Sequence, residues 1–160
     1  SILGCTLMTK RSTAENTGAG ANLDALVIEP YANPFRVYPL VEDYEKFKAL
    51  FDKGVDCYII NTGDFLGKKV TKEVSLGVIE TVVDGKANFE LFGGLPGMEY
   101  LPVEGYEVPD MNGEYAELIR DRMQFRLDYL KAFNDANPEH QIPQDALESI
   151  KTIERFIDVL

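Results

Sequence analysis

The chain has 160 residues, of which 45% are hydrophobic, and a formal net charge of −11 at pH 7. This length suits one domain, and this composition excludes the intrinsically disordered class. The acidic charge argues against a nucleic-acid or anionic-membrane partner, because either would need a basic surface. No apolar run approaches the roughly 20 residues that span a bilayer. We therefore expect a single domain, residues 1–160, in the cytoplasm.

Cysteine and histidine are scarce in this sequence. Cys5 and Cys57 are too few for a disulfide framework, and both lie in apolar stretches, so we expect two reduced, buried thiols. His140, the only histidine, lies in the polar turn NPEHQIP, where we expect it to be solvated. This set of side chains predicts no metal site and argues against a Ser/His/Asp or Cys/His catalytic arrangement.

The first forty residues predict short strands and irregular chain. LGCTLMTK, residues 3–10, alternates as a strand does, and the polar residues 12–24 predict a flexible surface loop. ALVIEP predicts a short strand that ends at Pro30, and the prolines after it forbid a regular helix. Because the strand-like pattern starts directly after Ser1, we expect the chain to be a fragment of something longer or a processed form.

Four helices are predicted by apolar residues that recur every three or four positions. The first runs for about three turns from Glu42 and is followed by a glycine stop signal. The second follows Thr71 and ends near Asp84, again before a glycine. Two further helices are predicted over residues 113–134 and from Pro143 onward. Their apolar stripes indicate core packing.

Between the first two helices, VDCYII (residues 55–60) predicts a strand buried on both faces of a sheet. The order helix, buried strand, loop and helix is typical of α/β layer folds. We therefore predict an α/β or α+β fold with a mixed sheet and flanking helices. Residues 1–110 would form the sheet-containing part with the loop 61–75, and residues 111–160 the two C-terminal helices.

The loop after VDCYII is the best candidate for a ligand site. In open α/β sheets ligands bind beyond the carboxyl ends of the strands, where a helix N-terminus presents free N–H groups. The G-x-x-x-x-G-K-[ST] phosphate loop is not matched, because Gly63 and Gly67 are four apart and Lys68 precedes another lysine. By spacing alone, an ordinary turn between a strand and a helix is favoured.

VDCYIINTGDFLGKKVTKEVSLGVIETVVDG, residues 55–85, resembles the C-terminal region of ATP-dependent phosphoenolpyruvate carboxykinases. In that family an apolar strand leads into Asn-Thr-Gly, a loop with Gly-Lys-Arg, and a helix that ends in Asn-Gly or Asp-Gly. The flanking EPYANPFRVYPLVEDYEKFKALFDKG and LFGGLPGMEYLPVEGYEVP are similar to the family's neighbouring segments in the same order. The likeness covers roughly residues 3–135, and the block 59–85 is its specific part.

The resemblance implies contacts to the adenine and ribose side of ATP. Lys69, which follows Lys68, would replace the arginine that covers the base. Val70 would replace the adjacent aliphatic residue and Ser75 the threonine within the helix. Lysine keeps the charge of arginine but lacks its planar fork. Asp64 also departs from the family, which often has an aromatic residue there.

The family's phosphate-binding loop, and its lysine, histidine and aspartate manganese ligands, have no counterpart in this sequence. The resemblance therefore implies a nucleotide-binding segment of a carboxykinase-like carboxy-lyase that is inactive alone. Its partners would be the nucleotide and the remainder of the parent chain, which would hold the divalent metal. Two alternatives stay open: a non-catalytic carboxykinase-like scaffold or partner-binding module, and an independent α/β domain that binds a small ligand.

Overall fold

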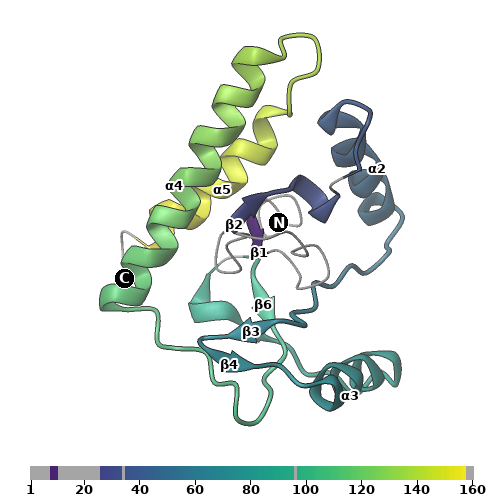
Figure 1. The fold of residues 1–160 in the computed structure, drawn as a ribbon, viewed down its shortest axis with the longest axis vertical. Coiled ribbons are helices and arrows are strands. Elements are labelled where there is room, and N and C mark those ends of the chain that lie inside the picture. The colour runs from purple at the N-terminus through teal and green to yellow at the C-terminus, as the bar shows by residue number, and fades with distance from the viewer. Residues whose placement is uncertain (1–7, 11–25, 34, 96, 158–160) are drawn as a thin grey trace, which may run out of the picture.

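The structure, a computed structural model, describes residues 8–10, 26–33, 35–95 and 97–157 (Figure 1). Helices and strands are mixed in these ranges, which confirms that part of the predicted fold class. The predicted loop over residues 12–24 and the thiol of Cys5 lie outside the described residues.

The described residues form four α-helices close to the predicted positions. They are α2 (Leu40–Asp52), α3 (Lys72–Val83), α4 (Gly113–Ala136) and α5 (Gln144–Ile157). Two 3₁₀ turns, Pro30–Ala32 and Phe92–Gly94, lie outside these helices. The backbone φ angle is +75° at Gly54 and +67° at Gly85, the left-handed conformation that ends α2 and α3 at little steric cost. None of the described helices has the length and apolar content needed to cross a membrane.

The strands in the described ranges pair two at a time, and every pair is antiparallel. The pairs are β1 (Met8–Lys10) with β2 (Leu26–Ile28), β3 (Asp64–Phe65) with β4 (Lys68–Lys69), and β5 (Glu90–Leu91) with β6 (Glu99–Tyr100). The described residues therefore do not form the predicted mixed sheet. The prediction of a short strand in ALVIEP is confirmed by β2.

The prediction of a buried strand over residues 55–60 is wrong. This segment runs from α2 to β3 without helix or strand (Figure 1), and Tyr58 and Ile59 are 51% and 53% exposed. Within the described ranges, residues 56–60 form no backbone hydrogen bond. Apolar side chains favour burial, but a strand also requires a neighbour that pairs with its N–H and C=O groups. Cys57 is accordingly half-buried rather than buried.

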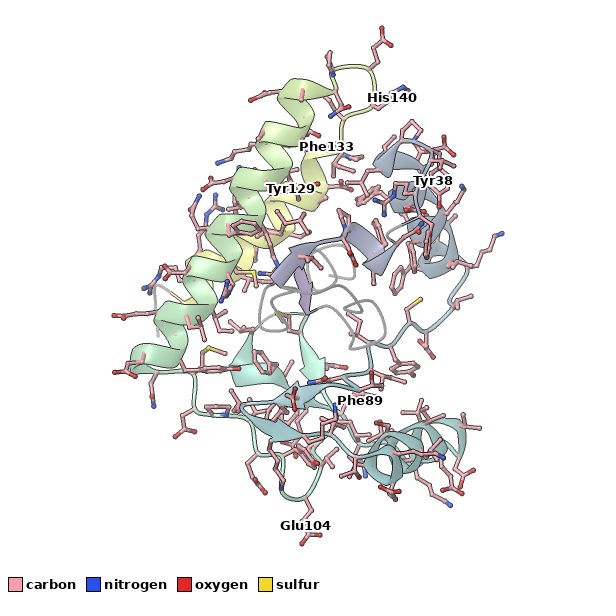
Figure 2. The ribbon with its side chains drawn as sticks, viewed as in Figure 1. Tyr38, Phe89, Glu104, Tyr129, Phe133 and His140 are labelled. Atoms are coloured by element: carbon pink, nitrogen blue, oxygen red, sulfur yellow. The ribbon has the colours of Figure 1, made fainter. Side chains whose placement is uncertain are left out.

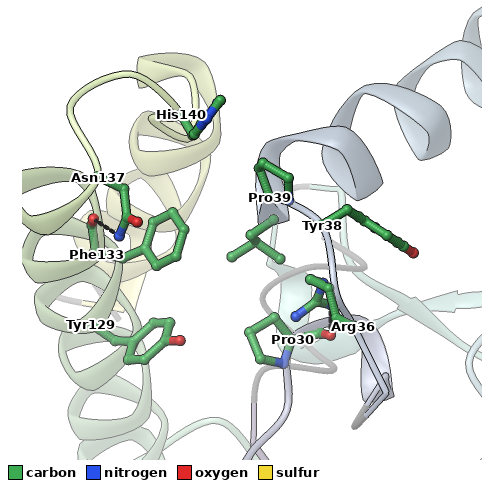
Figure 3. A pocket seen from close by; sticks show the side chains of 9 residues that line it. Pro30, Arg36, Tyr38, Pro39, Tyr129, Phe133, Asn137 and His140 are labelled. Atoms are coloured by element: carbon green, nitrogen blue, oxygen red, sulfur yellow. Dashed lines mark hydrogen bonds between the residues drawn. The ribbon is translucent and has the colours of Figure 1, made fainter.

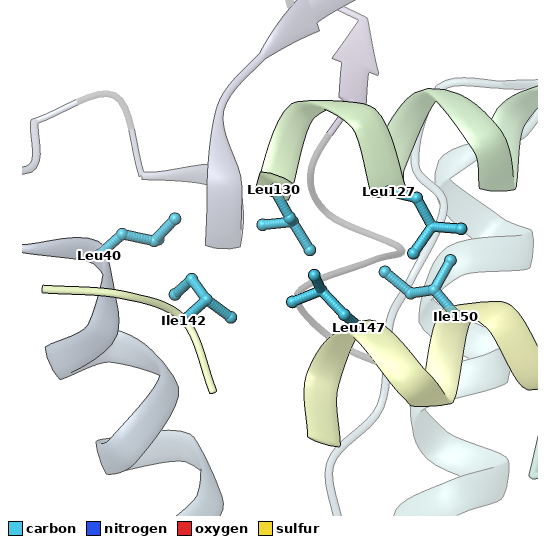
Figure 4. Close-up of a cluster of buried hydrophobic side chains, with 6 residues drawn as sticks. All are labelled: Leu40, Leu127, Leu130, Ile142, Leu147 and Ile150. Atoms are coloured by element: carbon cyan, nitrogen blue, oxygen red, sulfur yellow. The ribbon is translucent and has the colours of Figure 1, made fainter. Parts of the chain in front are cut away.

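The larger core lies where α4 and α5 pack side by side and meet the start of α2 (Figure 4). Its buried members are Leu40, Leu127, Leu130, Ile142, Leu147 and Ile150. Leu130 is fully buried. Complete burial of one such side chain stabilises the fold by about 1.5–3 kcal/mol, so this cluster fixes the two C-terminal helices against α2.

The loop between α4 and α5 is closed by Asn134. Its amide nitrogen donates to the carbonyl of Ile142 at 2.9 Å, and its amide oxygen accepts from the N–H of the same residue at 2.7 Å. Because both groups of one side chain hold one backbone unit, the direction in which the chain enters α5 is fixed. His140 lies exposed in this loop, as predicted.

A second cluster joins the β5–β6 hairpin to the start of α4. Leu95, Met111 and Ala116 are buried in it. Gly93 has φ +56°, and a Cβ atom there would lie 2.9 Å from Cβ of Met111. Glycine adopts this φ angle at little steric cost, and because it has no Cβ atom it leaves the Met111 side chain in place.

Candidate functional site

The segment singled out by the sequence is a hairpin followed by a helix. Asp64 pairs with Lys69 and Phe65 with Lys68. The two residues between them, Leu66 and Gly67, have φ angles of +49° and +81°, as a type I′ turn requires. The sequence favours an ordinary turn between a strand and a helix here. The structure corrects this prediction, because the segment forms a hairpin.

The base of this hairpin is closed by Asn61 and Gly63. The side-chain oxygen of Asn61 accepts from the N–H of Gly63 at 2.9 Å, while its nitrogen donates to the carbonyl of Asp64 at 3.0 Å. The N–H of Val70 then donates to the carbonyl of Gly63 at 2.9 Å. Asn-Thr-Gly therefore acts as a turn that sets the direction of β3.

Lys68 is held by the loop that carries Gly105 and Tyr106. Its ammonium donates to the carbonyl of Gly105 at 2.5 Å and lies 4.4 Å from the centre of the Tyr106 ring. The Tyr106 hydroxyl donates to the carbonyl of Lys69 at 2.7 Å. Hydrogen bonds from its own N–H and that of Gly105, and then the charge of Lys68, lower the pKa of Glu107. Lys68 is thus a structural residue of the hairpin.

Lys69 differs from Lys68 in the contacts of its side chain. Its side chain is exposed, and its ammonium forms no hydrogen bond or ion pair with the part of the chain that the structure describes. Val70, which follows it, is only 9% exposed, so it anchors the hairpin rather than offering a surface to a ligand.

Ser75 lies in the first turn of α3. Its hydroxyl donates to the carbonyl of Thr71 at 3.1 Å, and Thr71 in turn caps the helix by accepting from the N–H of Val74 at 3.3 Å. Hydrogen bonds from its own N–H and from Thr71 lower the pKa of Glu73. The structure therefore brings the four predicted residues together on one hairpin and helix start, with Lys69 as the member open to a ligand.

Elsewhere, the described residues line a smaller and a larger cavity, and neither is lined by the four predicted residues. The smaller, of about 220 Å³, lies between the start of α2 and the helix α4; Pro30, Arg36, Tyr129, Phe133 and His140 are among its walls. The larger, of about 410 Å³, is open and lies beside Gly93 and Tyr100. No group of three or more His, Cys, Asp or Glu side chains that could hold a metal ion occurs among the described residues.

A polar network that no sequence pattern predicts lies behind the smaller cavity. Asp43 is 7% exposed, and its carboxylate accepts from Nε of Arg36 and from the hydroxyl of Tyr38, both at 2.8 Å. Arg36 also donates to the carbonyl of Pro30. These contacts tie the proline-containing segment to α2. An acid in the first turn of a helix is too common a signal for sequence reasoning to single out Asp43.

Comparisons of this chain with protein-family models, with curated proteins and with solved structures found no match. Any function assigned to the chain therefore has to be supported by its own residues and their geometry.

Proposed function

We propose that this chain is the adenine-side nucleotide-binding segment of an ATP-dependent phosphoenolpyruvate carboxykinase-like protein, and that Lys69 meets the base. The observation that supports the proposal is the contrast between the two adjacent lysines. The ammonium of Lys68 is held by Gly105 and Tyr106, whereas the ammonium of the exposed Lys69 has no partner in the described ranges. Within the described part of the chain, the hairpin thus carries one ammonium without a partner, next to the start of α3.

The chemistry of that ammonium suits an adenine ring. A lysine placed over an aromatic face at an exposed site contributes about 0.5–1 kcal/mol. The Tyr106 hydroxyl holds the carbonyl of Lys69, which limits the positions that its backbone can take. Binding therefore loses less conformational entropy than it would on a loose loop.

The parent protein would convert oxaloacetate and ATP to phosphoenolpyruvate, carbon dioxide and ADP. Phosphoryl transfer of this kind depends on positioning and on charge stabilisation by divalent metal ions. In this proposal the present residues position the nucleotide, and the remainder of the parent chain holds the phosphates and the metal. Lys68, Val70 and Ser75 then support Lys69 as positioning residues.

Calorimetric titration of ATP into the chain and three variants tests this proposal. Lys69→Ala is expected to weaken binding about two- to fivefold, the loss of one exposed cation–π contact. Lys69→Arg restores a planar group that stacks on a base and is expected to bind at least as tightly as the natural chain. The control is Lys53→Ala, because Lys53 is also exposed but lies at the end of α2. Equal affinities for Lys69→Ala and Lys53→Ala would contradict the role of Lys69.

A second candidate function, a non-catalytic scaffold or partner-binding module, is favoured by one observation. Residues 55–60 expose apolar side chains, and residues 56–60 form no backbone hydrogen bond within the described residues, which suits a contact surface for another protein segment. This candidate predicts no change in melting temperature with nucleotide. A nucleotide at 100 times its Kd would instead stabilise the chain by about 2.7 kcal/mol.

A further inference from the structure

The cavity between α4 and the segment before α2 has two opposed walls (Figure 3). Tyr129 and Phe133 of α4 form one wall, and Pro30, Pro39 and Arg36 lie across from them. Figure 2 shows His140 at the end of the molecule opposite Glu104. Because Glu104 neighbours the residue that holds Lys68, the cavity is remote from the proposed nucleotide hairpin.

Arg36 places a positive charge in the wall of this cavity, and some of its N–H donors are not used by the described residues. Its Nε donates to Asp43 and its Nη2 to the carbonyl of Pro30. Within the described residues Nη1 has no acceptor. A guanidinium has five N–H donors in a rigid fork, so the two recorded bonds leave donors for a ligand.

Tyr129 faces Arg36 from the other wall with its hydroxyl turned toward the cavity (Figure 3). That hydroxyl has no hydrogen-bond partner in the part of the chain described. Burial raises the pKa of Tyr129, and the positive charge of Arg36 opposes that rise, so the field of Arg36 reaches the hydroxyl. A half-buried hydroxyl without a protein partner has a free donor for a ligand oxygen.

The rest of the wall is mainly apolar. Phe133, Leu40 and the two prolines present ring and methyl surfaces, and His140 lies at the exposed rim. A volume of about 220 Å³ corresponds to roughly seven water molecules at about 30 Å³ each. The space suits a small, flat, apolar body with one polar end.

We propose that this cavity binds a small organic carboxylate, with its apolar body between Phe133 and the prolines and its carboxylate bonded to Arg36 and Tyr129. A hydrogen bond from a guanidinium to an ionised acceptor is stronger than one to a neutral acceptor. Asp43, the other charged group at Arg36, already accepts from Arg36 and Tyr38 and is not among the residues that line the cavity. The proposal is independent of the nucleotide hairpin.

Benzoate is the test probe, with benzamide as its neutral analogue and benzylamine as its cationic one. Binding is followed by the NMR signals of the His140 ring at the rim of the cavity. These signals are identified directly, because the chain has one histidine. Benzoate is expected to shift these signals in a saturable way and to bind at least tenfold more tightly than benzamide or benzylamine. No saturable shift with benzoate, or equal affinity for benzamide, would overturn the proposal.

Tyr129→Phe is the informative variant, because it removes the hydroxyl and keeps the ring. It is expected to weaken benzoate binding about tenfold, as the loss of one hydrogen bond to a charged group does. Tyr58→Phe, the same change on an exposed tyrosine outside the cavity, is expected to have no effect. Arg36 is left unchanged in this test because its ion pair with Asp43 supports the fold. Identical affinities for the two variants would remove Tyr129 from the site and overturn the proposed carboxylate geometry.

Discussion

Among single residues, Asp43 shows how a buried charge is compensated in this fold. One of its oxygens accepts from Arg36 and the other from Tyr38, each at 2.8 Å. Burial of a carboxylate is costly unless it is paired and hydrogen-bonded, and here both oxygens are satisfied. The network also determines where the Arg36 guanidinium lies in the cavity wall.

Removal of this carboxylate provides the first prediction. Asp43→Ala is expected to lower the free energy of unfolding by about 3 kcal/mol, because Arg36 is then left without its charged partner. Asp52→Ala is the matched control on the same helix; its exposed pair with Lys48 is worth at most about 0.5 kcal/mol. Urea unfolding of both variants measures the difference. Similar, small losses would show that the Asp43 network does not stabilise the fold.

Among the elements, the helices could be predicted because their signals are local. Thr71 caps α3 through a bond to a residue three positions later, and Gly85 ends it in the left-handed conformation. The strands could not be predicted in the same way. Residues 55–60 have the composition of a buried strand, but pairing depends on segments far away in sequence, and none is provided within the described ranges.

The β3–β4 hairpin was missed for a residue-specific reason. Asn-Gly or Asp-Gly is the usual sequence signal for its turn, because both central residues need positive φ. Here Leu66 occupies the first position with φ +49°, a conformation that leucine adopts at a steric cost. The sequence therefore lacks the usual signal for a turn that the backbone nevertheless forms.

That steric cost gives the second prediction. Leu66→Asn is expected to raise the free energy of unfolding by about 1 kcal/mol, because asparagine tolerates positive φ and the leucine side chain is 62% exposed. Leu76→Asn, the same change at a 54% exposed position in α3, is expected to destabilise by about 0.5 kcal/mol through lower helix propensity. Urea midpoints compare the two. A loss of stability in Leu66→Asn would mean that leucine is not strained in this turn.

In the molecule as a whole, contacts between distant segments assemble what the sequence could not reveal. The cavity combines Arg36 with Tyr129, which meet only because the proline-containing segment packs near α4. The hydroxyl of Tyr44 donates to Asp145 at 2.8 Å and so connects α2 with the first turn of α5. Neither of these two contacts can be recognised from a local sequence pattern. The apolar stripes of α4 and α5, in contrast, predicted much of the core between these helices.

The contact between Tyr44 and Asp145 makes stability depend on pH. Burial, and then the hydrogen bond and charge of Asp145, raise the pKa of Tyr44 from 10.0 to about 12. In the unfolded chain the phenol ionises near pH 10, so its contribution is complete below that pH and is lost as pH rises toward 12. Tyr44→Phe is expected to flatten the fall in stability between pH 10 and 12, as followed by urea unfolding. An unchanged slope would contradict the role of Tyr44.

The central claim is that the hairpin presents Lys69 to adenine, and amide NMR spectra of the chain during an adenosine titration test it most directly. Adenosine lacks phosphates, so it isolates the side of the nucleotide assigned to this segment. We predict the largest saturable shifts at the amides of Gly67, Lys69 and Ser75, about two- to fivefold weaker adenosine binding from the same shifts in Lys69→Ala, and no comparable shifts with inorganic triphosphate. The claim would be contradicted if adenosine left these amides unmoved, or if triphosphate shifted them as strongly.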